Sequence, residues 1–229
     1  MSVLLPNLRD VGGKQADGGL VQTGRLFRSA LPMPTDIVPA AISWPPATII
    51  DLRSDMETAR EPQHPMSGAG VSVHKISLLS ELRPGDVPPT TLIDLYQYVL
   101  KTTSDRLVNV VETVATSQGA TLIHCAVGKD RTGISIAMVL SLLGVPREDI
   151  VQDYLETEKN KEAIIARLHL MNGTNLPAAS SDFLQTPVEA IEGVLNTWDA
   201  HALGAVGWFT EAGGSENTVD QLRDSMVKP

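Results

Sequence analysis

The chain has 229 residues, 42% of them hydrophobic, which is enough to bury one sizeable core. A net charge of -9 argues against nucleic acid or an anionic membrane as a partner, and a single cysteine excludes an intramolecular disulfide. The sequence has no apolar run as long as a membrane span and no signal-peptide pattern at its start, so we expect a cytoplasmic protein.

Strands and helices are predicted to alternate along the chain. After turn-rich residues 1–45, which hold one short strand at 26–28, apolar runs predict strands at 48–52, 71–78 and 121–124. Helical spacing of apolar residues predicts helices at 92–100, from Ser104 to about 119, 132–143, 147–160, 186–203 and 218–227, with one or two more after 160. This alternation favours an α/β fold with a central, mostly parallel sheet flanked by helices. No internal repeat occurs, so we expect a single domain over residues 1–229.

A cysteine loop joins the predicted strand at 121–124 to the next helix. Its sequence runs from His124 and Cys125 through Ala126, Val127, Gly128, Lys129 and Asp130 to Arg131, Thr132 and Gly133. Five residues between Cys125 and Arg131 suffice to curl the backbone so that its N–H groups point at one centre, beside a helix N-terminus. The arrangement predicts a binding site for a phosphate dianion.

The side chains of this loop suit phosphoryl transfer. The positive field at its centre favours the thiolate form of Cys125 and makes it a nucleophile. Arg131 can hold two phosphoryl oxygens, and Thr132 can donate its hydroxyl to the sulfur when the thiolate leaves again. We expect Gly128 to allow close backbone approach, and His124 to lie behind the loop with its ring bonded to backbone.

No metal or organic cofactor is predicted. The chemistry of Cys125 and Arg131 requires neither. The histidines are scattered along the chain without HxxxH or HExxH spacing; they are His64, His74, His124, His169 and His201.

Other interpretations of the loop explain less of the sequence. An isolated cysteine at a strand end is usually a small buried hydrophobic residue, but here glycine, arginine and a helix follow at the right spacing. A nucleotide-binding P-loop fails because it needs glycine where Ile123 stands and Ser or Thr where Asp130 stands. A sulfurtransferase loop and a phosphate-binding module without turnover stay open as alternatives.

The segment from His124 to Gly133 resembles the protein tyrosine phosphatase signature, His-Cys-x5-Arg-Ser/Thr. Blocks elsewhere are similar to a bacterial and fungal group that includes dual protein and phosphoinositide phosphatases; they are residues 7–13, 26–30, 51–54 with Glu57, and 153–155. The resemblance implies a catalytic core at about 7–160, and helices at about 161–229 that match no motif. It also implies a phosphomonoester hydrolase acting on phosphotyrosine proteins through a Cys125 phosphoenzyme, with dual specificity. Phosphoinositides are the alternative substrate.

Three aspartates compete for the role of general acid. Asp130 ranks first because members of the resembled group carry an aspartate at this place in the loop. Asp51 ranks second, since it ends a strand whose carboxyl edge should face the same pocket. Asp86 ranks third; it lies upstream of Cys125, near where many tyrosine phosphatases carry a Trp-Pro-Asp acid, but the tryptophan is absent.

Two cations bear on the substrate. Lys129 either attracts a substrate with more than one phosphate or is a solvated charge at the rim of the site. The resemblance places Arg53 near the substrate, whereas the sequence alone predicts a surface charge at a strand end. Arg28 and Asp10 are a candidate buried pair to which we assign no chemistry.

Overall fold

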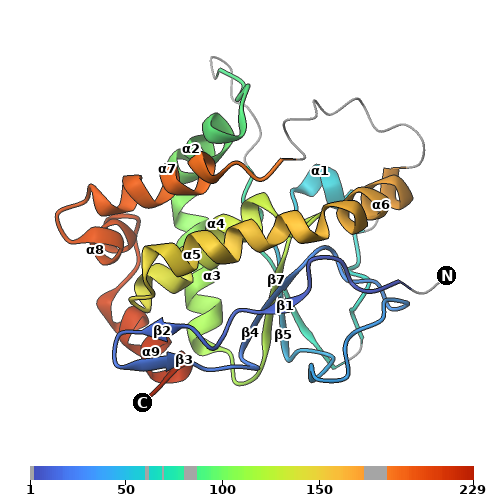
Figure 1. The fold of residues 1–229 in the computed structure, drawn as a ribbon, viewed down its shortest axis with the longest axis horizontal. Coiled ribbons are helices and arrows are strands. Elements are labelled where there is room, and N and C mark those ends of the chain that lie inside the picture. Colours follow the sequence, from blue (N-terminus) through green and yellow to red (C-terminus); the bar gives the residue numbers. More distant parts are fainter. Residues whose placement is uncertain (1–2, 60–61, 69, 80–86, 173–184) are drawn as a thin grey trace.

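The central sheet has five strands in the order β1-β4-β7-β5-β6. The structure is a computed structural model that describes residues 3–59, 62–68, 70–79, 87–172 and 185–229. The strands span Arg9–Asp10 (β1), Leu26–Ser29 (β4), Thr48–Asp51 (β5), Ser72–Lys75 (β6) and Thr121–His124 (β7). β1 runs antiparallel to β4 and the other neighbours are parallel, which confirms the mostly parallel sheet that the sequence predicts (Figure 1).

Helices cover this sheet, and most of them gather on one side of it in Figure 1. They span Asp55–Thr58 (α1), Leu92–Thr102 (α2), Ser104–Thr116 (α3), Asp130–Leu142 (α4), Arg147–Leu155 (α5), Lys161–Asn172 (α6), Val188–Asp199 (α7), Gly204–Glu211 (α8) and Glu216–Met226 (α9). In the part of the chain that the structure describes, no helix has the length and apolar character needed to cross a bilayer.

The inner strands are buried on both faces because their side chains alternate between two apolar clusters. Ile50 and Ile123 pack into the main core, which they share with the helices. Ile49 and Leu122 point the other way, into a smaller cluster with Met66. β7 lies in the middle of the sheet, so the backbone of Cys125, the residue that follows it, is held by a rigid strand.

The C-terminal helices share the main core with the part of the chain that carries the motifs. Ile191 and Trp198 of α7 and Leu222 of α9 belong to that core. A second, antiparallel sheet joins β2 (Gln15–Ala16), β3 (Gly19–Val21) and β8 (Val227–Lys228), so the last residues pair with the first turns. The sequence does not predict this sheet, because strands of two or three residues are too short to show a period.

Several predicted boundaries are wrong. The helix expected at 186–203 is α7 and ends at Asp199; the next helix, α8, begins only at Gly204, whose φ of +57° lies outside the helical region. The helix expected at 147–160 ends at Leu155 and continues as a tighter 3-10 turn. The strand expected at 71–78 shortens to 72–75.

Candidate active site

The cysteine loop begins where the central strand ends. The register aligns His124, the last residue of β7, with Ser29 of β4 and Asp51 of β5. Cys125 follows directly, and α4 begins at Asp130. The loop therefore lies at the carboxyl edge of the parallel strands, where open α/β sheets bind their ligands.

Three carbonyl groups of the loop point away from its centre, toward donors of the surrounding scaffold. The Cys125 carbonyl accepts from His124 Nδ1 (3.0 Å), the Ala126 carbonyl from the Leu31 amide (3.2 Å), and the Gly128 carbonyl from Asn7 Nδ2 (2.7 Å) and Arg28 Nη2 (2.8 Å). In a trans peptide the carbonyl and the following N–H point in opposite directions. The amides of Ala126, Val127 and Lys129 are therefore aimed inward, which is the arrangement that binds an anion.

Gly128 is the one position of this loop that tolerates no side chain. Its φ of +70° lies in the left-handed region, and a Cβ built there would stand 2.1 Å from the Ser29 carbonyl oxygen. Its amide donates to Cys125 Sγ over 3.3 Å, so the same turn that needs glycine also brings a donor to the sulfur.

A buried ion cluster supports the loop from behind. Arg28 donates to the Gly128 carbonyl and pairs with Asp153 of α5 over 2.5 Å, and Arg9 pairs with the same carboxylate over 3.0 Å. The expected pairing of Arg28 with Asp10 is wrong: Asp10 accepts instead from the amides of Gly12 and Gly24. In the antiparallel pairing of β1 with β4, Arg28 lies opposite Arg9, and Asp10 lies opposite Phe27 instead.

The sulfur of Cys125 is enclosed by the loop, and the residue is 1% exposed. Thr132, in the first turn of α4, is fully buried, and its hydroxyl has no hydrogen-bond partner among the residues that the structure describes. A buried hydroxyl normally has a partner. This one is available to a group that enters the loop or to the sulfur itself.

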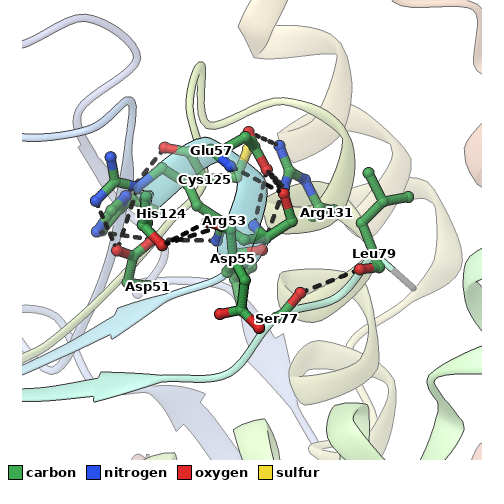
Figure 2. Close-up of polar contacts among 12 residues, drawn as sticks. Asp51, Arg53, Asp55, Glu57, Ser77, Leu79, His124, Cys125 and Arg131 are labelled. Atoms are coloured by element: carbon green, nitrogen blue, oxygen red, sulfur yellow. Dashed lines mark hydrogen bonds and ion pairs between the residues drawn. The ribbon is translucent and has the colours of Figure 1, made fainter. Parts of the chain in front are cut away.

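Arg131 is held in place by a carboxylate for which the sequence predicts no role. Its guanidinium forms a two-pronged ion pair with Glu57 of α1, with distances of 2.6 and 2.8 Å (Figure 2). It also donates to the Leu52 carbonyl. Burial by itself raises the pKa of Glu57, but the hydrogen bonds and charge of Arg131 outweigh it and hold that pKa below its ordinary value. The Ser54-x-x-Glu57 capping-box spacing was the available signal, since Glu57 also accepts from the Ser54 amide.

Asp130 is the centre of a polar network at the start of α4. Its Oδ1 accepts from Lys129 Nζ (2.6 Å) and from the Tyr96 hydroxyl (2.9 Å), which in turn contacts the Tyr154 hydroxyl (2.9 Å). Burial, and then the nearby Asp130 carboxylate, raises the pKa of Tyr96 well above its ordinary value, so Tyr96 stays a donor. Lys129 is only 3% exposed, so its interpretation as a solvated rim charge is wrong.

Arg53 and Asp51 form a second buried pair on the other side of Cys125 from Arg131 in Figure 2. Arg53 donates to Asp51 through Nε (3.0 Å) and Nη2 (2.8 Å), so the prediction of a surface charge is wrong. Burial alone raises the pKa of Asp51, but the hydrogen bonds from Arg53 and the neighbouring charge lower it below its ordinary value. The third candidate acid, Asp86, lies outside the described residues.

Two histidines that the sequence separates lie side by side behind the loop. His64 Nε2 is 2.9 Å from His124 Nε2, and Asp51 Oδ1 is 3.9 Å from the same atom. These three buried side chains are the one group in the described chain with the donor spacing of a metal site. The histidines are thus less scattered than the sequence suggested.

This trio does not fit a metal as it is arranged. The Met66 amide donates to His64 Nδ1 over 3.1 Å, so in the neutral ring the proton is on Nε2, where a metal would need the lone pair. Asp51 is already committed to Arg53. A hydrogen bond between the two imidazoles satisfies all of these contacts.

A larger cavity, of about 690 Å³, lies away from this chemistry. It is lined by Thr48 at the start of β5, by the end of α3 and by Thr218 and Gln221 of α9. The start of β5 is the opposite end of the sheet from Cys125, so this cavity is not part of the site.

A Cys-x5-Arg loop between the central strand of a parallel sheet and a helix defines the class of cysteine-dependent phosphatases. The model of the tyrosine phosphatase family matches residues 4–228, and the chain belongs to that family. A protein of Cupriavidus necator named as a tyrosine-protein phosphatase is 28% identical over 97% of this chain and 82% of its own length. The triple specificity protein phosphatase PtpB of Mycobacterium tuberculosis is 29% identical over 57% of this chain and 52% of its own.

Two solved structures show a distant likeness. The catalytic domain of the PP-IP phosphatase SIW14 of S. cerevisiae has a TM-score of 0.42 at 15% identity and covers 86% of this chain and 95% of its own. TpbA of P. aeruginosa has a TM-score of 0.34 at 18% identity and covers 95% and 89%. These scores are low, so membership of the family depends on the family model.

Proposed function

We propose that this enzyme hydrolyses phosphate monoesters, foremost phosphotyrosine in proteins, through a phosphoenzyme on Cys125. The observation that carries the proposal is the loop itself: the carbonyls of Cys125, Ala126 and Gly128 are held outward, and the Gly128 amide donates to the buried sulfur. Family membership supports the same activity.

In the first step we assign the nucleophile to the Cys125 thiolate. Its sulfur forms a bond to phosphorus while the bond from phosphorus to the leaving oxygen breaks. The loop amides and the Arg131 guanidinium hold the three equatorial oxygens and stabilise their charge. This step requires Asp130 in its protonated form, which gives its proton to the leaving oxygen as general acid.

In the second step water attacks the phosphocysteine. Asp130, now a carboxylate, takes the proton from the water while the bond from sulfur to phosphorus breaks, which returns the thiolate and releases phosphate. We assign the unpartnered hydroxyl of Thr132 to the stabilisation of that departing sulfur. Neither step calls for a metal or an organic cofactor.

The remaining predicted residues take supporting places in this proposal. The amides of Ala126, Val127 and Lys129 bind phosphate, and Gly128 allows the turn that presents them. His124 orients the Cys125 carbonyl. Arg53 and Asp51 shape the neighbouring edge, because each is already paired with the other.

Replacement of the nucleophile tests the mechanism. Cys125→Ser should abolish turnover of a phosphotyrosine peptide while it retains peptide binding, because the loop amides and Arg131 remain. Ser135→Ala, which removes a hydroxyl that bonds the Arg131 carbonyl, serves as a folding control. Turnover by Cys125→Ser at the wild-type rate contradicts the phosphoenzyme, and an inactive wild-type protein would favour a binding module.

The assignment of the acid is tested separately. Asp130→Asn should flatten the basic limb of the pH–rate profile, whereas Asp51→Asn should leave that limb in place, since Asp51 is bonded to Arg53. The opposite result would move the acid to Asp51.

A phosphoinositide is the second candidate substrate, because the relative PtpB is named for triple specificity and Lys129 adds a cation to the loop. The ion pair of Lys129 with Asp130 favours a phosphoprotein instead, since the Lys129 charge is already neutralised by Asp130 and is less available to a second phosphate. Rates on a phosphotyrosine peptide, a phosphothreonine peptide and a phosphoinositide, measured side by side, decide between them.

We also propose that residues 1–229 form one domain that works in the cytoplasm. The shared core of α7, α9 and the central sheet supports one domain, and a single cooperative unfolding transition is the expected result. The lone cysteine supports a reducing compartment. Fractionation of cells that express the protein tests the second part.

A further inference from the structure

A chain of three hydrogen bonds connects a backbone amide to the carbonyl of the nucleophile through the two buried histidines. The Met66 amide donates to His64 Nδ1 (3.1 Å), His64 Nε2 faces His124 Nε2 (2.9 Å), and His124 Nδ1 faces the Cys125 carbonyl oxygen (3.0 Å). Both rings are buried, at 8% and 0% exposure.

The backbone groups at the two ends determine where the protons lie. The Met66 amide can only donate, so His64 Nδ1 must accept and its proton lies on Nε2. His64 Nε2 then donates to His124 Nε2, which leaves the proton of His124 on Nδ1, where the carbonyl can accept it. Each ring is neutral and every nitrogen has a partner.

The direction of these bonds matters for the phosphate loop. The Cys125 carbonyl is held outward by His124, and the Ala126 amide of the same peptide is therefore aimed at the centre of the loop. Without a donor at Nε2, His124 is free to take the other tautomer, which has no proton to give to that carbonyl.

We propose that His64 is a positioning residue for catalysis, which acts through His124 to aim the Ala126 amide at the substrate phosphate. This role rests on the proposed phosphatase function, but the hydrogen bonds can be measured without it. The surroundings suit a neutral relay, since the nearest charges, Asp51 and Arg53, are paired with each other.

A cavity beside His64 allows a small molecule to replace the imidazole ring of His64 in a variant that lacks it. It has a volume of about 250 Å³, and its lining includes His64, Asp51 and Arg53 together with the exposed residues Gln63 and Lys75. Removal of the His64 side chain enlarges this space toward His124. A small imidazole from solution can then reach the place of the missing ring.

The first test compares two replacements. His64→Gln keeps an N–H donor near the position of Nε2, whereas His64→Met keeps the bulk without a donor. We expect His64→Met to lower kcat on a phosphotyrosine peptide roughly 10-fold to 100-fold, because the Ala126 amide is then no longer aimed at the phosphate. His64→Gln should retain most of the activity. His74→Met, on the exposed His74 of β6, is the matched control and should match the wild type.

The second test reads the tautomers directly. Nitrogen-15 NMR of the imidazoles in the wild-type protein should show His124 protonated at Nδ1 and His64 at Nε2, and His64→Met should turn His124 into a mixture of tautomers. A merely structural role for His64 would lower the melting temperature without this change. A His124 protonated at Nε2 in the wild type overturns the relay.

The third test is rescue of His64→Ala. Imidazole should restore kcat because it carries an N–H donor, whereas 1-methylimidazole, which has none, should not. Equal rescue by both compounds, or wild-type kcat in His64→Met, contradicts the proposal. If the wild type hydrolyses no phosphomonoester, the proposed function fails, and the NMR result alone decides the hydrogen-bond chain.

Discussion

The guanidinium of Arg131 is fixed in place by two neighbours at the edge of the proposed phosphate site. A free arginine loses side-chain entropy when it grips phosphate, but this one is already fixed by Glu57 and by the Leu52 carbonyl. Glu57 comes from a four-residue helix far from the loop in sequence, so only the fold reveals the pair.

Glu57→Gln tests the value of that ion pair. The replacement keeps the shape of the side chain and removes its charge, so we expect kcat/KM to fall roughly 10-fold or more with little change in melting temperature. Asp55→Asn is the control, because Asp55 lies on the same helix in an exposed pair with Lys75. Equal kinetics for the two variants would show that Glu57 does not position Arg131.

The buried tyrosines give a second prediction at this scale. Tyr96→Phe removes a donor to Asp130, whereas Tyr154→Phe removes a hydroxyl one bond further away. If Asp130 is the acid, Tyr96→Phe should move the basic limb of the pH–rate profile more than Tyr154→Phe does. Each variant should also lose about 1–3 kcal/mol of stability, because it leaves a buried partner unsatisfied. Identical profiles for the two variants would remove Tyr96 from the proposed site.

At the scale of elements, the loop depends on contacts from the residue Asn7 before β1, from β4 and Leu31 after it, and indirectly from α5. The loop sequence allows its amides to converge, but Asn7, Arg28 and Leu31 are what hold its carbonyls outward. Asp153 of α5 then balances the charge of Arg28 and Arg9. Burial raises the pKa of Asp153, but the two guanidinium groups outweigh it and lower that pKa.

Asp153→Asn should therefore be costly. It leaves two buried or half-buried guanidinium groups without their carboxylate, and we expect a loss of about 3–5 kcal/mol in the free energy of unfolding. Urea denaturation measures this. Asp199→Asn, in a solvent-exposed pair with Arg147, is the control and should cost less than about 1 kcal/mol. Comparable losses in both variants would contradict a structural role for the buried cluster.

At the scale of the whole molecule, the buried histidines make stability depend on pH. Burial, and then the neighbouring His124, lowers the pKa of His64 from 6.5 to about 4, and burial lowers that of His124 too. Between these values the unfolded chain binds a proton that the folded protein does not, so stability falls as pH drops from about 6.5 toward 4. The lowered pKa of Asp51 acts in the same direction only at more acidic pH.

Urea midpoints across this range check that dependence. The shift of His64 corresponds to a loss of roughly 3 kcal/mol between pH 7 and pH 4 in the wild type. His64→Gln removes the titrating group and should show a shallower slope. Parallel slopes for the two proteins would mean that His64 is protonated in the folded state as readily as in the unfolded chain.

The sequence by itself determined the class of fold, the central strand at 121–124 and the Cys-x5-Arg loop, because periodicity and a compact motif are local properties. The ranking of Asp130 ahead of Asp51 as general acid stays a prediction. Only the tertiary structure decided which charges meet. Glu57 with Arg131, Asp153 with Arg28 and His64 with His124 are joined across long sequence separations, and such pairs depend on strand order and helix packing, which no local pattern contains.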